Sequence, residues 1–206
     1  MPTITRITQQ KDSNRANIYL DGKFAFGLSL EGILQNNLKT GKVLSQEAID
    51  NLRGGAEEEK VYNKVLRFVT SRPHSEYEIK LWFRRKKVNP EQVERVFDRL
   101  KNLDMVDDKV FARWWIEQRL TFRPKSQRAL IVELRQKGVE REVIEDVLAN
   151  VEFNEVEVAQ KVAEKQKGRL KNLPQDLRNR KLSEYLARRG FSWEVVKQIL
   201  AKNDKI

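Results

Sequence analysis

Three prolines constrain the fold most strongly, because they recur at a fixed spacing. Pro73, Pro124 and Pro174 lie 51 and 50 residues apart. Each introduces a stretch of the same pattern: RPHSEYEIKLWFRRKKVNPEQVERVFDRL, RPKSQRALIVELRQKGVEREVIEDVLANV and LPQDLRNRKLSEYLARRGFSWEVVKQILA. A fixed period of this length is typical of stacked structural repeats. The chain is therefore predicted to contain three similar modules in tandem.

One helix of each repeat has recognisable first and last residues. Two positions after the prolines stand residues that can accept a hydrogen bond from the free N–H groups of a new helix, namely Ser75, Ser126 and Asp176. Gly138 and Gly190 follow a cation at the other end, which is typical of a helix that stops in a left-handed turn. Lys87 takes the glycine's place in the first copy. We therefore expect that turn to form without glycine's conformational freedom.

This helix is the second of three in each repeat. After it, apolar residues recur at positions i, i+5, i+8 and i+9, which keeps one face of a third helix buried. A leading helix is predicted before each proline, over residues 57–71, 107–122 and 154–170. The last of these has few large apolar side chains and is expected to be the least stable. The modules are assigned to residues 56–105, 106–153 and 154–206, and their stacking predicts an elongated, curved array.

Residues 1–55 differ from the repeats. Short β-branched or aromatic runs predict antiparallel strands over residues 3–10, 16–20 and 23–28, with a tight hairpin turn at Asp21-Gly22. Two short helices are predicted at residues 29–38 and 45–52. Gly54-Gly55, followed by three glutamates, is interpreted as a hinge before a longer helix. The predicted fold is thus mainly α, with three tandem three-helix repeats behind a small N-terminal region that contains a β-hairpin.

Charge and composition narrow the class of partner. The net charge of +11 points to a polyanion, whether nucleic acid, an acidic protein surface or anionic lipid. The chain has no cysteine, as expected for a protein of the reducing cytosol. It has no apolar run of the roughly 20 residues that a membrane span needs. We therefore expect a cytoplasmic protein without a membrane partner.

Little in the sequence points to catalysis. The one histidine, His74, lies just before a predicted helix cap, and no cysteine or second histidine could help it bind a metal. A structural or partner-contact role is therefore favoured. Asp107 and Asp108 are interpreted as cap and dipole partners of a helix, with a metal-dependent nuclease site as a remote alternative. The Gly-Lys pairs lack the serine or threonine of a phosphate-binding loop. We predict no catalytic residue, no metal site and no cofactor.

Basic residues gather on the second helices, whereas residues 140–157 carry seven acids and one arginine. Stacking would align these helices, and we favour a continuous binding stripe over merely solvated faces. Trp82, Trp114 and Trp115 have rings that can stack on bases, but their positions on apolar stripes favour core packing. The predicted partner-binding cations are Lys80, Arg84, Arg85, Lys87, Arg128, Arg135, Lys137, Arg178, Arg180, Lys181, Arg188 and Arg189.

Four segments, in order along the chain, carry a family resemblance. They are RPHSEYEIKLWFRRK, VDDKVFARWWIEQRL, LIVELRQKGVEREVIEDVL and YLARRGFSWEVVKQIL. The cap at residues 74–78, the paired aspartates before an aromatic helix at 106–119 and the Lys-Gly-Val turn within 133–139 resemble the RecX family of bacterial regulatory proteins. The opening ITRITQQKDSNRANIYLDGKFAFGLS is similar to the N-terminal extension of longer members.

The resemblance implies a protein that binds the RecA recombinase filament on single-stranded DNA, in its groove across neighbouring subunits. It would restrain filament growth and so reduce strand exchange, ATP hydrolysis and co-protease activity during homologous recombination, DNA repair and the SOS response. Contact with duplex DNA is a further expectation, and we expect the chain to act as a monomer. The alternative is a stand-alone DNA-binding protein that competes with RecA for DNA.

Overall fold

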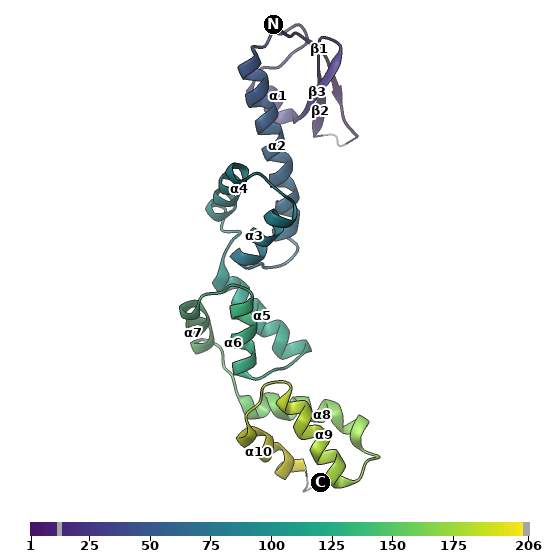
Figure 1. Cartoon of the computed structure of the whole chain (residues 1–206), viewed down its shortest axis with the longest axis vertical. Coiled ribbons are helices and arrows are strands. Elements are labelled where there is room, and N and C mark those ends of the chain that lie inside the picture. Colours follow the sequence, from purple (N-terminus) through teal and green to yellow (C-terminus); the bar gives the residue numbers. More distant parts are fainter. Residues whose placement is uncertain (12–13, 204–206) are drawn as a thin grey trace. The chain divides into compact units, whose positions relative to one another are not determined.

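A computed structural model describes residues 1–11 and 14–203 (Figure 1). Within these residues, three strands are followed by ten helices, one helix fewer than the sequence pattern predicts. The chain divides into two compact units, each made of two segments. The first unit comprises Met1–Phe68 and Val88–Arg99, and the second comprises Val69–Lys87 and Leu100–Ile206.

The first unit begins with the predicted antiparallel sheet. Its strands are β1 (Ile4–Gln9), β2 (Arg15–Leu20) and β3 (Lys23–Ser29), in that order across the sheet. Asp21 and Gly22 join β2 to β3 with φ angles of 47° and 81°, the left-handed geometry of an Asp-Gly turn. The sheet contributes apolar side chains to a buried cluster, namely Ile4, Ile18, Phe26 and Leu28.

Two helices follow the sheet, and the second of them corrects the expectation of a hinge. Helix α1 (Leu30–Gln35) lies within the helix predicted at residues 29–38 and is capped by Ser29. Helix α2 (Gln46–Val69) runs without interruption through Gly54 and Gly55, so the short helix expected at residues 45–52 is its first part. Two glycines cost a helix about 2 kcal/mol relative to alanine. The buried side chains of Ile49 and Ala56, which join the sheet cluster on either side of the glycines, offset that cost.

Helix α4 (Pro90–Asn102) contributes its first ten residues to the same unit. Arg95 Nε lies 2.6 Å from Glu58 Oε2 on α2. One turn further along α4, the Arg99 guanidinium stacks 3.7 Å from the centre of the Tyr62 ring. These contacts join the two helices through long side chains at the edge of the buried core.

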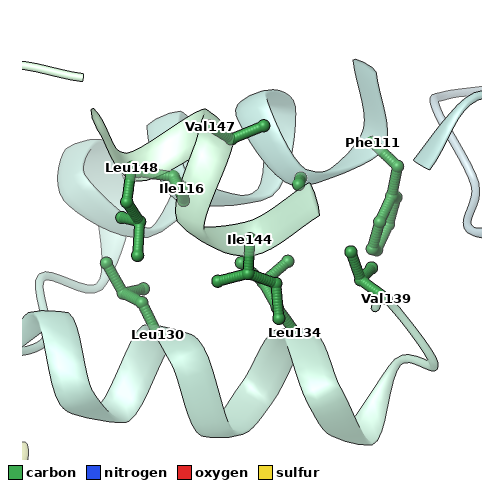
Figure 2. Packing of buried hydrophobic residues seen from close by; sticks show 9 residues of the cluster. Phe111, Ile116, Leu130, Leu134, Val139, Ile144, Val147 and Leu148 are labelled. Atoms are coloured by element: carbon green, nitrogen blue, oxygen red, sulfur yellow. The ribbon is translucent and has the colours of Figure 1, made fainter. Parts of the chain in front are cut away.

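The second unit contains one helix of the first repeat and all the helices of the other two. They are α3 (Glu76–Arg85), α5 (Asp108–Phe122), α6 (Gln127–Gln136), α7 (Arg141–Ala149), α8 (Glu155–Leu170), α9 (Gln175–Ala187) and α10 (Trp193–Asn203). In the second repeat, α5, α6 and α7 close around one apolar core (Figure 2). Phe111 of α5 lies beside Val139, and Leu130 and Leu134 of α6 meet Ile144 and its neighbours on α7.

The third repeat closes a separate core. Phe191 and Ile199 pack there with Leu182 and Leu186 of α9. Helix α8 adds only Ala159, Val162 and Ala163 to the buried set, which matches the lack of large apolar residues in its sequence. Because small side chains remove little apolar surface from water, α8 gains less from packing than α5 does. Its low stability stays a prediction.

Two of the three predicted caps are confirmed. The hydroxyls of Ser75 and Ser126 accept the N–H groups three residues further on, at 3.1 and 3.2 Å. The cap assigned to Asp176 is wrong. Pro174 itself takes the extended cap conformation, with φ −53° and ψ 149°, so α9 starts two residues earlier and Asp176 lies in its first turn. Lys87 has the predicted left-handed turn, with φ 52° and no glycine.

Candidate functional site

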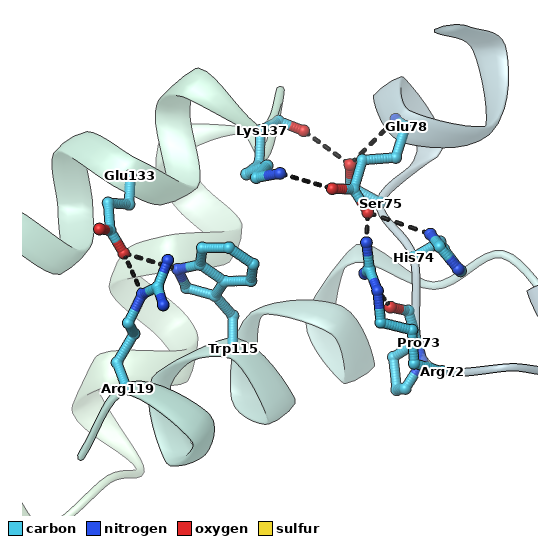
Figure 3. Close-up of polar contacts among 9 residues, drawn as sticks. All are labelled: Arg72, Pro73, His74, Ser75, Glu78, Trp115, Arg119, Glu133 and Lys137. Carbon is cyan, nitrogen blue, oxygen red and sulfur yellow. Dashed lines mark hydrogen bonds and ion pairs between the residues drawn. The ribbon is translucent and has the colours of Figure 1, made fainter. Parts of the chain in front are cut away.

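The second helices of neighbouring repeats meet end to end in the second unit. At the start of α3, Ser75 Oγ donates to the carbonyl of Lys137 at the end of α6, over 2.7 Å (Figure 3). Lys137 also places Nζ 2.6 Å from Glu78 Oε1. The C-terminus of α6, the negative end of its dipole, therefore contacts the positive N-terminus of α3. This contact between residues 72–78 and residues 137–138 is the first junction.

The same contact recurs one repeat further on. Ser126 donates its backbone N–H to the carbonyl of Arg189 at 3.1 Å, and Arg189 Nη1 donates to the carbonyl of Pro124 at 2.8 Å. Arg189 Nη2 also donates to the hydroxyl of Tyr185, over 2.7 Å. This contact between residues 124–126 and residues 189–190 is the second junction. In both junctions, the cation before the helix-ending glycine holds the start of the preceding repeat's second helix.

The two glycines of the junctions allow the helices to approach this closely. Gly138 and Gly190 have φ angles of 79° and 89°. A Cβ atom at position 138 would lie 2.4 Å from Tyr77 Cβ, and one at position 190 would lie 2.5 Å from Ser126 Oγ. Carbon atoms in contact are normally about 3.5–4.0 Å apart. Any side chain at either position would therefore push the repeats apart.

Glu78 is at the centre of the charges in the first junction. Its carboxylate accepts from Arg72 at 2.9 Å, pairs with Lys137 and lies 3.1 Å from His74 Nδ1 (Figure 3). Burial raises the pKa of Glu78, but the hydrogen bonds and charges of Arg72 and Lys137 outweigh it and hold the pKa below its ordinary 4.5. His74 is 4% exposed, so it is a structural residue of the junction rather than a partner contact.

Glu133 forms a comparable cluster inside the second repeat. It accepts from Trp115 Nε1 at 2.9 Å and from Arg119 Nε at 2.7 Å (Figure 3). It also accepts from Lys125 Nζ. Burial raises the pKa of Glu133, and these three donors together lower it below its ordinary value. Trp114 and Trp115 pack against the core of the repeat, which confirms core packing over base stacking for these two rings.

The paired aspartates organise the start of α5, as predicted. Asp107 Oδ1 accepts from the N–H groups of Lys109 and Val110, at 2.7 and 3.1 Å. Asp108 Oδ1 accepts from the N–H of Glu76, at 2.8 Å, and so joins α5 to the start of α3. Burial raises the pKa of Asp108, and the nearby carboxylates add to that rise. Both aspartates therefore act on helix N-termini.

The structure sorts the predicted partner-binding cations into three groups. Lys137 and Arg189 are used in the junctions. Lys80 and Arg180 are exposed and pair with Glu76 and Glu184 one helical turn away, contacts worth at most about 1 kcal/mol. The third group forms no ion pair within the described residues, and consists of Arg84, Arg85, Lys87, Arg128, Arg135, Arg178, Lys181 and Arg188. This third group is the unpaired set, and all its members are exposed except Arg178, which is half-buried.

Sequence reasoning left one group of cations out of the binding set. Lys161, Lys165, Lys167 and Arg169 on α8, and Lys171 just beyond it, are exposed. None of them forms an ion pair with any residue that the structure describes. The signal was visible, because residues 161–189 hold ten basic residues against three acids. They were left out because α8 is a leading helix, not a second helix.

Comparison with known proteins identifies the family. Sequence models of the RecX N-terminal domain and of the first, second and third RecX three-helix domains match residues 2–45, 62–100, 107–148 and 154–200. The chain belongs to the RecX family. Among the described helices of this family member, none combines the length and the apolar character needed to cross a bilayer.

Relatives and solved structures of RecX agree with this assignment. Regulatory protein RecX of Bacillus licheniformis is 31% identical over 206 residues, which cover 99% of this chain and 78% of the relative. That of Clostridium acetobutylicum is 32% identical over 215 residues, which cover 98% of each chain. The crystal structure of a regulatory protein RecX is 28% identical, with a TM-score of 0.70 over 97% of this chain and 98% of the other.

The crystal structure of RecX from Lactobacillus salivarius supports the fold alone. It is 22% identical, with a TM-score of 0.59, and the match covers 72% of this chain and 97% of the other. The relatives are named regulatory proteins, and their names state no catalytic activity.

Proposed function

We propose that this chain binds the RecA filament on single-stranded DNA and restrains its recombinase, ATPase and co-protease activities. The observation that carries the proposal is the succession of four RecX domains, in order, from residue 2 to residue 200. Exposed cations on α3, α6 and α9 support it. A chain of net charge +11 is attracted to a filament that contains DNA, and unpaired cations contribute most to that attraction.

The repeats suit a partner that is itself periodic. The junctions link the start of α3 to the end of α6, and the start of α6 to the end of α9, so the unpaired set is carried on helices whose ends are fixed to one another. Several weak contacts then act together, because the first one holds the others near their targets. Helices that are held in place before binding also lose less conformational freedom on binding.

A charge-reversal experiment tests the proposed surface. Changing Arg84, Arg85 and Lys87 to glutamate should weaken inhibition of RecA's DNA-dependent ATPase without changing the helix content measured by circular dichroism. A matched control reverses three exposed cations of the first unit, Lys23, Lys39 and Arg53. It changes the net charge equally and should inhibit like the unmodified chain. Equal inhibition by both triple variants would exclude the α3 surface.

The alternative is a DNA-binding protein that acts by masking DNA, and its sequence support is the same basic charge. The stoichiometry of inhibition separates the two functions. A filament regulator should inhibit RecA's ATPase when far fewer molecules are present than would cover the DNA. A masking protein should inhibit only in proportion to the DNA that it covers. Inhibition that disappears when naked single-stranded DNA is supplied in excess would favour masking.

A further inference from the structure

Helix α8 carries a row of like charges that its own fold does not neutralise. Lys161, Lys165 and Arg169 are spaced by four residues, so they lie on one side of the helix at intervals of about 6 Å along its axis. Like charges at this spacing destabilise a helix. Glu164, the one acid between residues 161 and 171, accepts a hydrogen bond from Gln160. A helix with so little buried apolar surface therefore keeps a repulsive row, which a bound anion would offset.

A cleft lies beside this row, and an exposed aromatic residue is next in the chain to some of the residues that line it. The cleft has a volume of about 550 Å³, and its walls are Lys161, Glu164 and Lys165 of α8 and Leu120, Thr121 and Pro124 at the end of α5. Phe122 stands in the chain between the lining residues. Phe122 does not itself line the cleft, but it is 69% exposed, more than any other aromatic residue that the structure describes. Arg123, the next residue, is exposed as well.

We infer that this cleft binds single-stranded DNA, with a base stacked on Phe122 and backbone phosphates held by Lys161 and Lys165. Single-strand binding sites combine cations that follow the backbone with aromatic rings on which bases stack. A duplex is a poorer fit, because its bases are already stacked on one another. An acidic peptide would use the lysines but has no base to stack. The inference rests on the proposed function, because binding to the RecA filament brings the chain to single-stranded DNA. It adds the place on the chain where that DNA binds.

Binding of a fluorescein-labelled oligothymidine, followed by fluorescence anisotropy without RecA, tests the stacking contact. Phe122→Ala should weaken binding about 5- to 150-fold, the range for loss of one stacked base. The slope of log affinity against log salt should not change, because no phosphate contact is lost. Phe24→Ala is the matched control, since Phe24 is 60% exposed in the first unit, and it should bind like the unmodified chain.

Loss of the lysine charges should have the opposite effect from Phe122→Ala, because it should change the salt dependence of binding. Changing Lys161 and Lys165 to glutamine should lower the steepness of the salt dependence by about 1.4, because each phosphate on a single strand contributes about 0.7. Lys60 and Lys64 of α2 provide the control, since they are exposed lysines with the same four-residue spacing. Their double glutamine variant should keep the original slope.

Several results would overturn the inference. The first is a failure of the unmodified chain to bind the oligonucleotide at low salt. The second is an equal affinity of the Phe122→Ala and Phe24→Ala variants. The third is a loss of affinity in Phe122→Ala that is as large for duplex DNA as for the single strand. Displacement of the oligonucleotide by polyglutamate, with the same loss in Phe122→Ala for both ligands, would assign the cleft to an acidic protein instead. Because RecA is absent from these measurements, such failures leave the filament proposal to its own test.

Discussion

Replacing Gly138 by alanine should destabilise the second unit more than the left-handed backbone alone explains. Alanine in a left-handed conformation costs about 1–2 kcal/mol. The new Cβ would also lie 2.4 Å from Tyr77 Cβ, and relieving such overpacking adds about 1–3 kcal/mol. The expected loss in the free energy of unfolding is therefore about 2–5 kcal/mol. Urea denaturation followed by circular dichroism measures it from the shift in midpoint.

Two further variants separate the contact from the backbone strain. Gly41 has φ 88°, and a Cβ added there would meet nothing within 4 Å, so Gly41→Ala should lose only about 1–2 kcal/mol. Gly138→Asn relieves much of the backbone strain, since asparagine tolerates positive φ, but it keeps the Cβ. It should therefore remain strongly destabilised. The reasoning is refuted if Gly138→Ala is no worse than Gly41→Ala, or if Gly138→Asn is nearly as stable as the unmodified chain.

Three other substitutions test the junction, a cap and a core. Glu78→Gln should lose about 1.5–3 kcal/mol at neutral pH. Because the folded pKa of Glu78 is lowered, its stabilisation is fully present above the unfolded value of 4.5 and is lost as pH falls through the folded pKa, so the variant's disadvantage in thermal unfolding should shrink in acid. Asp107→Ala should lose about 1 kcal/mol in urea denaturation, as expected for a helix cap, with RecA inhibition unchanged. Phe111→Ala should lose about 3–5 kcal/mol by the same assay, because it leaves a cavity in the core of the second repeat.

Local rules predicted the elements whose causes are local. The cap at Ser126 and the turn at Asp21-Gly22 depend on groups within a few residues of each other, and both are confirmed. Gly54-Gly55 was wrongly interpreted as a hinge because helix propensity there is outweighed by burial of Ile49 and Ala56. Helix propensity is a local property, so it does not account for packing against a sheet whose residues are distant in the sequence.

The candidate site also has features that local sequence predicts and features that depend on the folded structure. That the second helices are basic follows from the sequence, but which cations remain available does not. Lys137 contacts Ser75 across 62 residues of sequence, and Arg189 contacts Pro124 across 65. No charge pattern distinguishes these two cations from Arg135 or Arg188 beside them. Burial of Glu78 and the end-to-end contact of the helices determine which cations are used in the junctions. Both are properties of the folded chain.

The two junctions place different requirements on the three repeats, because only some of them could form a junction with a repeat on each side. A junction needs a proline and a capping serine on one helix, and a cation followed by glycine on the other. The second repeat has both halves, at residues 124–126 and 137–138. The first repeat has Lys87 where the glycine would stand, and the third has Asp176 where the serine would stand. If a chain of this kind gains a repeat by gene duplication, the middle repeat should be the one that is copied. A copy of either end repeat would lack one of the two halves of a junction.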